Sequence, residues 1–179
     1  MITPHNSVLA LVDIQVKLAA VMHRREELIR RLIPLIQGCR RLEIPILLAE
    51  QNPERMGTTL PELKSLIPDI PALPKLTFSC WRDPGWNAAL KTLGRDRVLL
   101  AGIESHVCIA QTAADLAAAG YAVEVVVDAV SSRTPADLAI GLEKIKAAGA
   151  ALTGVESVLF ELLGTAQHPA FKDILRLVK

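Results

Sequence analysis

RVLLAGIESHVC, residues 97–108, is the stretch of sequence from which the fold of this chain can be worked out. Residues 97–101 form a short, mostly apolar run, which is typical of a strand buried on both faces of a parallel sheet. Apolar residues then recur at helical spacing from residue 109 to residue 119, and Gly120 supplies a stop. Cys108 is therefore expected in the first turn of a helix that begins at the carboxyl end of a central strand.

This position favours a reactive Cys108. The free N–H groups and the positive dipole end of a helix start favour a thiolate, so we expect a thiol pKa below the ordinary value of about 8.5. A cysteine that only fills space would occupy the same place by chance, and the position alone does not separate the two interpretations.

Length and composition set the class of protein. The chain has 179 residues, of which 51% are hydrophobic, and this predicts one domain over residues 1–179. The net charge of +1 gives no indication of nucleic acid or an anionic membrane as a partner. The three cysteines form no CxxC pair, and no secretory leader or apolar run of about 20 residues is present, so a reducing, cytoplasmic location is expected.

Strand and helix patterns alternate along the whole chain. Strands are predicted over 7–14, 44–49, 73–76, 97–101, 122–127 and 150–152, and helices over 24–42, 61–66, 85–93, 109–119, 135–148, 155–163 and 169–177. Pro34 predicts a kink or break in the first long helix, and Thr153 with Glu156 has capping-box spacing before residue 155. The order predicts an α/β fold: an open, mostly parallel six-stranded doubly wound sheet, order 3-2-1-4-5-6, with helices on both faces.

Three side chains with complementary chemistry fall at the carboxyl ends of the predicted strands. Asp13 ends the first, Lys75 lies near the end of the third, and Cys108 follows the fourth. In this strand order the first and fourth strands are neighbours where the winding reverses, which is the usual ligand crevice. A carboxylate can act as a base for a thiol, and an ammonium stabilises the resulting anion. Taken singly, Asp13 could cap a turn, Lys75 could be a solvated surface cation, and Cys108 could fill space.

Other site motifs are missing from the sequence. It contains no G-x-G-x-x-G after the first strand, no phosphate-binding P-loop and no G-x-S-x-G nucleophile elbow. The four histidines are dispersed, which predicts no metal site. His106 alone lies near the candidate site.

The residues together resemble the isochorismatase-like cysteine hydrolases, and in particular the isochorismatase domain-containing subgroup. The similarity rests on D-x-Q at 13–15, on K-L-T-F-S at 75–79 and on G-I-E-x-x-x-C at 102–108. It continues through EQNP at 50–53, VDAVSSR at 127–133, TGVE at 153–156 and HPAFK at 168–172. Each motif is weak alone, but their common order covers nearly the whole chain.

The resemblance implies a mechanism. Cys108 would be the nucleophile, Asp13 the general base and later acid, and Lys75 the charge that holds both. It also implies a cis peptide bond between Ile103 and Glu104, with the backbone N–H groups of Glu104 and Cys108 forming an oxyanion hole. The implied reaction is hydrolysis of a small amide or related carbonyl compound, at a non-peptide C–N bond, through a thioester.

Departures from the family pattern narrow the expected activity. Nicotinamidases of the family bind a metal through an aspartate and histidines after the second strand, whereas residues 50–59 here contain no histidine. We therefore expect no catalytic metal and no cofactor, and the sequence argues against nicotinamide as substrate. Isochorismatases in the strict sense cleave a vinyl ether without a cysteine nucleophile, so the retained Cys108 argues against that substrate. Candidate pocket residues are Gln15, Gln51, Phe78, Trp81 and His106.

Two other hypotheses stay open. One is a catalytically silent binding or assembly module with the same fold, and the other is a thiol redox protein in which Cys80 approaches Cys108. The family resemblance further implies a homo-oligomer acting on a small molecule.

Overall fold

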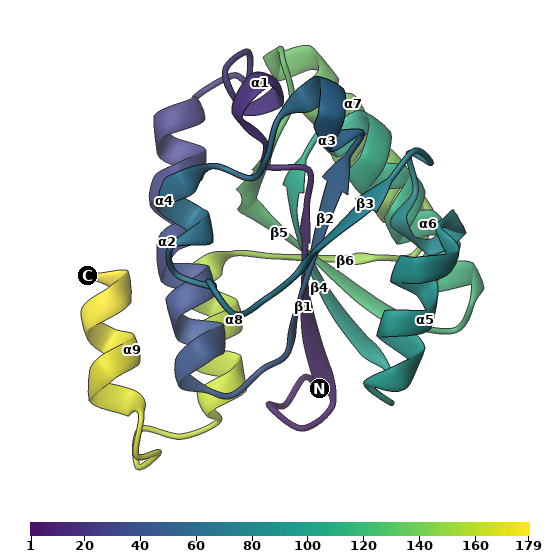
Figure 1. Cartoon of the computed structure of the whole chain (residues 1–179). Coiled ribbons are helices and arrows are strands. Elements are labelled where there is room, and N and C mark those ends of the chain that lie inside the picture. Colours follow the sequence, from purple (N-terminus) through teal and green to yellow (C-terminus); the bar gives the residue numbers. More distant parts are fainter.

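A six-stranded parallel sheet forms the centre of the protein in the computed structural model, which describes all 179 residues (Figure 1). Its order is β3-β2-β1-β4-β5-β6, which confirms the predicted architecture. The strands are β1 (Ser7–Val12), β2 (Ile46–Gln51), β3 (Ala72–Lys75), β4 (Arg97–Ile103), β5 (Ala122–Ser131) and β6 (Ala151–Thr153). The carboxyl ends of β1 and β2 lie toward the top in Figure 1, on the side of α1 (Val16–Ala19) and α3 (Pro53–Met56).

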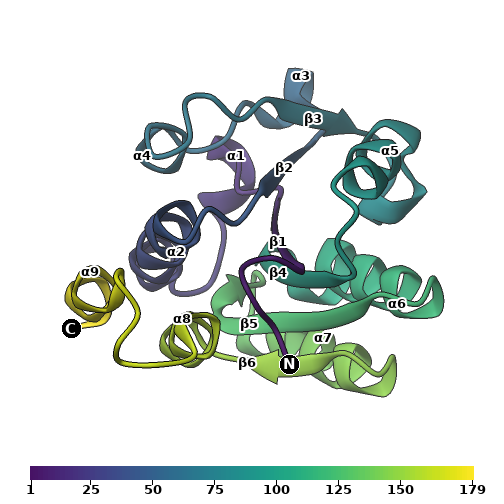
Figure 2. The same cartoon turned by 90° about the horizontal axis from the view of Figure 1, so that it is seen from below.

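Helices cover both faces of the sheet (Figure 2). One face carries α2 (Arg25–Arg41), α4 (Pro61–Lys64), α8 (Val155–Leu163) and α9 (Phe171–Val178), and the other carries α5 (Pro84–Thr92), α6 (Ala110–Ala118) and α7 (Pro135–Ala147). Because successive residues of a strand point to opposite faces, β1 contributes Leu9 and Leu11 to one hydrophobic core and Val8 and Ala10 to the other. None of the helices combines the length and apolarity that crossing a bilayer requires.

The two central strands approach each other closely at their carboxyl ends. Val12 of β1 pairs with Gly102 of β4, and a Cβ atom on Gly102 would lie 2.1 Å from the Val12 carbonyl oxygen. Gly102 also has a φ of +123°, which residues with side chains rarely adopt. Only glycine fits here, and it brings the chain segments that follow β1 and β4 side by side.

Several local expectations differ from the structure. The strand predicted from residue 44 begins at Ile46, because Pro45 has no N–H for the sheet ladder. The predicted break at Pro34 is absent, since α2 runs through it as one helix. The predicted capping box of α8 is wrong: Gly154 is the N-cap, and Asp128 Oδ1 accepts a hydrogen bond of 2.9 Å from the Val155 N–H instead.

Candidate active site

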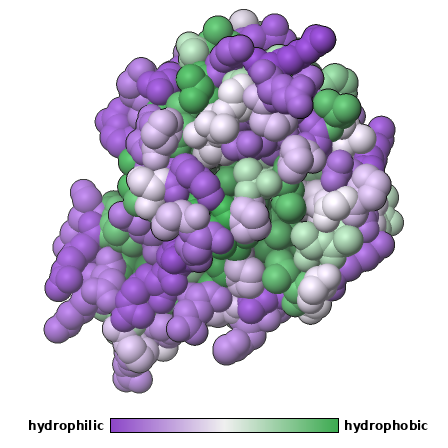
Figure 3. Space-filling model, viewed as in Figure 1, coloured by the Kyte–Doolittle hydropathy of each residue, from purple (hydrophilic) through white to green (hydrophobic).

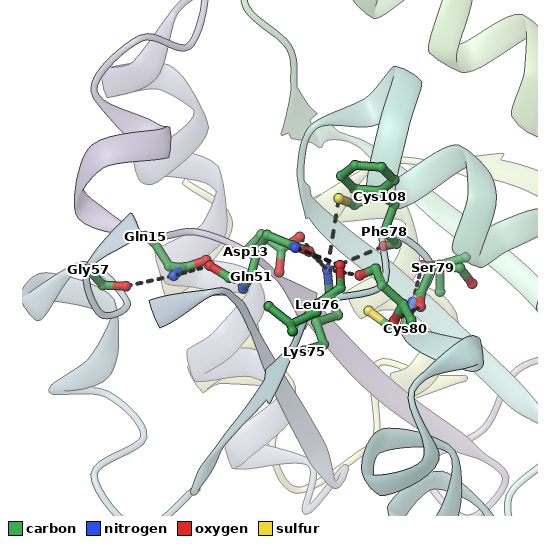
Figure 4. A network of polar contacts seen from close by, with 12 residues as sticks. Asp13, Gln15, Gln51, Gly57, Lys75, Leu76, Phe78, Ser79, Cys80 and Cys108 are labelled. Carbon is green, nitrogen blue, oxygen red and sulfur yellow. Dashed lines mark hydrogen bonds and ion pairs between the residues drawn. The ribbon is translucent and has the colours of Figure 1, made fainter. Parts of the chain in front are cut away.

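Asp13, Lys75 and Cys108 come together at the carboxyl edge of the sheet (Figure 4). Asp13 directly follows β1, Lys75 is the last residue of β3, and Cys108 lies after β4. Lys75 Nζ is 2.8 Å from Asp13 Oδ2 and 3.9 Å from Cys108 Sγ, and all three residues are buried. The structure thus places the ammonium between the carboxylate and the thiol.

The Lys75 ammonium is held by neutral acceptors as well. Nζ donates to Gln51 Oε1 at 2.8 Å and lies 3.2 Å and 3.3 Å from the carbonyl oxygens of Thr77 and Phe78. Burial alone would lower the pKa of Lys75, but the charge of Asp13 and the two nearby thiols outweigh it, so the pKa is raised. Lys75 is therefore a fixed positive charge.

Asp13 has one oxygen engaged and one free. Oδ2 accepts from Lys75, whereas Oδ1 is buried with no hydrogen-bond partner. The residue has a φ of +57°, in the left-handed region that aspartate enters more readily than most residues. Burial raises the pKa of Asp13, although Lys75 acts in the opposite direction. The carboxylate thus has a raised proton affinity and an unused acceptor atom.

The prediction of a low pKa for Cys108 is wrong. Burial and the charge of Asp13 raise the pKa of the Cys108 thiol and outweigh the opposing effect of Lys75. One ammonium faces two acids here, and the stronger acid, Asp13, takes the negative charge. The resting form of Cys108 is a neutral thiol, and a base is needed to activate it.

Cys108 lies in a π-helical turn, η2 (Ser105–Ile109), that precedes α6. The turn packs directly against α7, where a Cβ atom on Gly141 would lie 2.6 Å from the Ser105 carbonyl carbon. The hydroxyl oxygen of Ser132, the residue after β5, lies 2.6 Å from Ser105 Oγ and 2.9 Å from His106 Nδ1. Packing and hydrogen bonds therefore fix the turn that carries Cys108.

The chain enters this turn through a cis peptide bond between Ile103 and Glu104. This is the geometry that the family resemblance implies. The Glu104 N–H has no hydrogen-bond acceptor within the protein, so it is available to a bound molecule.

A cavity of about 270 Å³ adjoins Cys108 and Asp13. Gln51 and Phe78, two of the candidate pocket residues, line it, and Phe78 is 55% exposed. The remaining lining residues are Leu18, Asn52, Arg55, Met56, Ile103, Glu104 and Val107. The sequence identified residues 50–59 only as a polar loop, and nothing in it distinguishes Asn52, Arg55 and Met56 from their neighbours.

The other three candidate pocket residues do not line this cavity. Gln15 is fully buried, and its side-chain amide donates to the carbonyl oxygens of Gln51 and Gly57. Trp81 packs edge-on against Tyr121 with ring centroids 5.4 Å apart. His106 turns toward Ser132. Their positions near the motifs in sequence do not indicate the direction of their side chains.

The fold and site agree with the match of residues 7–157 to the family described as Isochorismatase domain. The chain belongs to this isochorismatase family. It is 37% identical to isochorismatase domain-containing protein 2 of Xenopus laevis over 97% of this chain and 83% of the relative. This confirms the resemblance to the isochorismatase domain-containing subgroup.

Solved structures show the same architecture. The MAR1 ribonuclease of Caenorhabditis elegans aligns with a TM-score of 0.93 and 39% identity, over 99% of this chain and 91% of that protein. The YcaC gene product of Escherichia coli, described as an octameric hydrolase of unknown specificity, aligns with a TM-score of 0.89 over 99% of this chain and 94% of that protein. At 22% identity, the second comparison shows the fold alone.

No group of three His, Cys, Asp or Glu side chains in this isochorismatase domain is arranged to hold a metal ion. Glu50, one of the two acids within residues 50–59, accepts hydrogen bonds of 2.7 Å from both the N–H and the hydroxyl of Thr59. Its carboxylate therefore secures the loop after β2.

The three cysteines are unpaired thiols. Cys39 and Cys80 are fully buried, and burial raises the pKa of each to about 12. Cys108 is the one cysteine that lines the cavity.

Proposed function

We propose that this protein is a hydrolase that uses the Cys108 thiol to cleave a non-peptide C–N bond in a small amide or related carbonyl compound. The observation that carries the proposal is the meeting of Asp13, Lys75 and Cys108, from three separate strand ends, beside a cavity that Asp13 and Cys108 line. A nucleophile, a base and a fixed cation are sufficient for acyl transfer.

Asp13 starts the reaction. Because the resting thiol is neutral, the Asp13 carboxylate takes the thiol proton as Cys108 Sγ attacks the substrate carbonyl carbon. The C–S bond forms, and the carbonyl electrons move to oxygen. Asp13 then returns the proton to the leaving nitrogen, the C–N bond breaks, and a thioester remains. Lys75 keeps its positive charge throughout and balances the single negative charge of the site.

Water completes the cycle. Asp13 takes a proton from a water molecule as the water attacks the thioester carbonyl. The C–S bond then breaks, and Asp13 returns the proton to sulfur, which gives a carboxylic acid, the free thiol and the Asp13 carboxylate. The Glu104 N–H, which has no acceptor in the protein, and the Cys108 N–H would donate to the developing oxyanion. A donor of this kind contributes about 2.7–4 kcal/mol to transition-state stabilisation in other enzymes.

A screen of small amides with ammonia release as the readout tests the proposal. Cys108→Ala and Asp13→Asn should each abolish turnover, EDTA should leave the rate unchanged, and an acyl-enzyme mass should appear when the reaction is quenched early. Cys39→Ala is the matched control, because Cys39 is buried in the core away from the cavity. Turnover that survives Cys108→Ala would end the proposal, and a protein that hydrolyses no amide would be a silent module.

RNA belongs in the same screen, because the C. elegans relative is described as a ribonuclease. The cavity of about 270 Å³ lies at the small end of ligand pockets and suits a small molecule better than a polymer. RNA cleavage that depends on Cys108 would indicate that the protein is a nuclease instead of an amide hydrolase.

We also propose that the chain forms a homo-oligomer. Leu76 and Phe78, in the segment that follows β3, are 75% and 55% exposed. Hydrophobic residues also gather in the middle of the face shown in Figure 3. The octameric E. coli relative supports self-association. Light scattering after gel filtration should give a multiple of 19.4 kDa, and Leu76→Asp should lower it; a wild-type monomer would contradict the proposal.

A further inference from the structure

The charged residues that line the cavity are not equally paired. Asp13 is neutralised by Lys75, and Glu104 Oε2 accepts from Arg133 Nε at 2.9 Å. Arg55, the third charged lining residue, forms no ion pair and its side chain makes no hydrogen bond. Once the two pairs cancel, the cavity keeps one uncompensated positive charge.

A second cation stands beside the first. Lys17 Nζ donates to the Arg55 carbonyl oxygen at 2.6 Å, which ties α1 to α3, and Lys17 also forms no ion pair. Glu54, the neighbouring acid on α3, does not line this cavity. Lys17 does not line the cavity either, so Lys17, Arg55 and Glu54 together leave one net positive charge on α1 and α3.

The remainder of the cavity is largely apolar. Leu18, Met56, Phe78, Ile103 and Val107 supply hydrophobic side chains to the lining that Cys108 and Arg55 share. A bound molecule would place its reacting carbonyl at Cys108, a short apolar segment along these residues, and an anionic group at Arg55. A guanidinium binds a carboxylate with two parallel hydrogen bonds, so a carboxylate fits best.

We propose that Arg55 determines specificity by binding a carboxylate of the substrate, and that the substrates are amides that carry an acidic group, such as half-amides of short dicarboxylic acids. This inference rests on the proposed hydrolase function. Neither the Cys108 motif nor the family resemblance assigns a role to Arg55.

Alkylation of Cys108 tests the inference without knowledge of the substrate. Iodoacetate and iodoacetamide have nearly the same shape, and each forms an S–C bond with loss of iodide and of the thiol proton. Only iodoacetate carries a charge. The ratio of their rates at one pH reports the electrostatic environment of the cavity, because the neutral reagent corrects for any change in thiol reactivity. Mass mapping of the Cys108 peptide isolates this site from the two buried cysteines.

Arg55→Gln should lower the iodoacetate-to-iodoacetamide rate ratio by about threefold or more, which is the size expected for one charge a few ångströms from the reagent in a partly solvated site. Arg55→Lys should keep most of the ratio. Arg30→Gln is the matched control, because Arg30 is exposed on α2 and forms no ion pair. An unchanged ratio in Arg55→Gln would overturn the inference.

Turnover separates this inference from the function on which it rests. Succinamate and butyramide are amides of similar length, and only succinamate has a carboxylate. Arg55→Gln should raise KM for succinamate about tenfold and change kcat/KM for butyramide much less. Equal effects on both amides would contradict the role of Arg55 and leave the hydrolase intact. If no amide released ammonia, the proposed hydrolase function would be contradicted. The labelling ratio would still decide whether Arg55 attracts an anion.

Discussion

The Lys75 ammonium lies 2.8 Å from Asp13 Oδ2, with 0% of the Lys75 side chain and 1% of the Asp13 side chain exposed to solvent. Each charge would be costly to bury alone, so each residue depends on the other. The pair links the ends of β1 and β3, which are separated by β2 in the sheet. The site is thus part of what holds this edge of the sheet together.

Removing one member of this pair should destabilise the protein. Lys75→Met leaves Asp13 buried without its cation, and we expect a loss of about 3–5 kcal/mol in the free energy of unfolding, measured by urea denaturation at pH 7. The double variant Lys75→Met/Asp13→Asn should lose less than the sum of the two single variants. Lys172→Met, on the exposed side of α9, is the control. Additive losses would show that the two groups do not interact.

Asp13→Asn should separate the reactivity of the thiol from catalysis. Burial and the charge of Asp13 raise the pKa of Cys108, whereas Lys75 lowers it, so loss of the carboxylate removes one of the raising effects and should lower the pKa of the thiol. The variant thiol should react faster than the wild type with iodoacetamide at pH 8, while amide turnover falls about 10²- to 10⁴-fold for want of a base. Asp96→Asn, an exposed position at the opposite edge of the sheet, should change neither rate. Slower labelling in Asp13→Asn would contradict the assigned charges.

Gly141→Ala should disturb the turn that carries Cys108. Its added methyl group would overlap the backbone of Ser105 and His106, at 2.6 Å and 2.7 Å, and backbone cannot move aside as a side chain can. We expect a loss of about 1–3 kcal/mol in stability together with a large fall in turnover. At Gly154 the nearest atom lies at 3.6 Å, so Gly154→Ala should have a small effect on both. Full activity in Gly141→Ala would mean that α7 does not position the turn.

The buried thiol of Cys39 should make the protein sensitive to alkaline pH. Burial raises its pKa from 9.0 to about 12, so between these values the unfolded chain loses a proton that the folded chain keeps. Stability therefore falls as pH rises, by about 1.4 kcal/mol per pH unit for this one group. The free energy of unfolding, measured by urea denaturation at pH 9.5, 10.25 and 11, should fall less steeply with pH in Cys39→Ala than in the wild type, by this amount per pH unit. Equal slopes in the two proteins would count against a buried, protonated Cys39.

Most of the architecture could be predicted from the sequence. Apolar runs without polar alternation mark strands buried on both faces, and the alternation with helices leads to the observed order. The same logic located Asp13, Lys75 and Cys108 at the carboxyl edge, since polar residues that directly follow such runs meet there. The C-terminal end of β5 was predicted too early, because Asp128 interrupts the apolar run whereas the strand continues to Ser131.

The properties that depend on distance could not be predicted. The raised pKa of Cys108 follows from its burial and from its closeness to Asp13, a residue 95 positions away that competes for the same lysine. The approach of Gly141 to η2 follows from the packing of α7 and has no local sequence signal. Arg55 is one charge in a polar loop, and only the assembled cavity reveals that it lacks a partner.

The three site residues are supplied by strand ends that lie far apart along the chain, and the carboxyl ends of the two central strands approach closely only because Gly102 has no side chain. No excised fragment contains a working subset of these groups. Loss of amide hydrolysis during denaturation should therefore coincide with the loss of far-UV circular dichroism. Enzymatic activity would then report whether the whole sheet has formed.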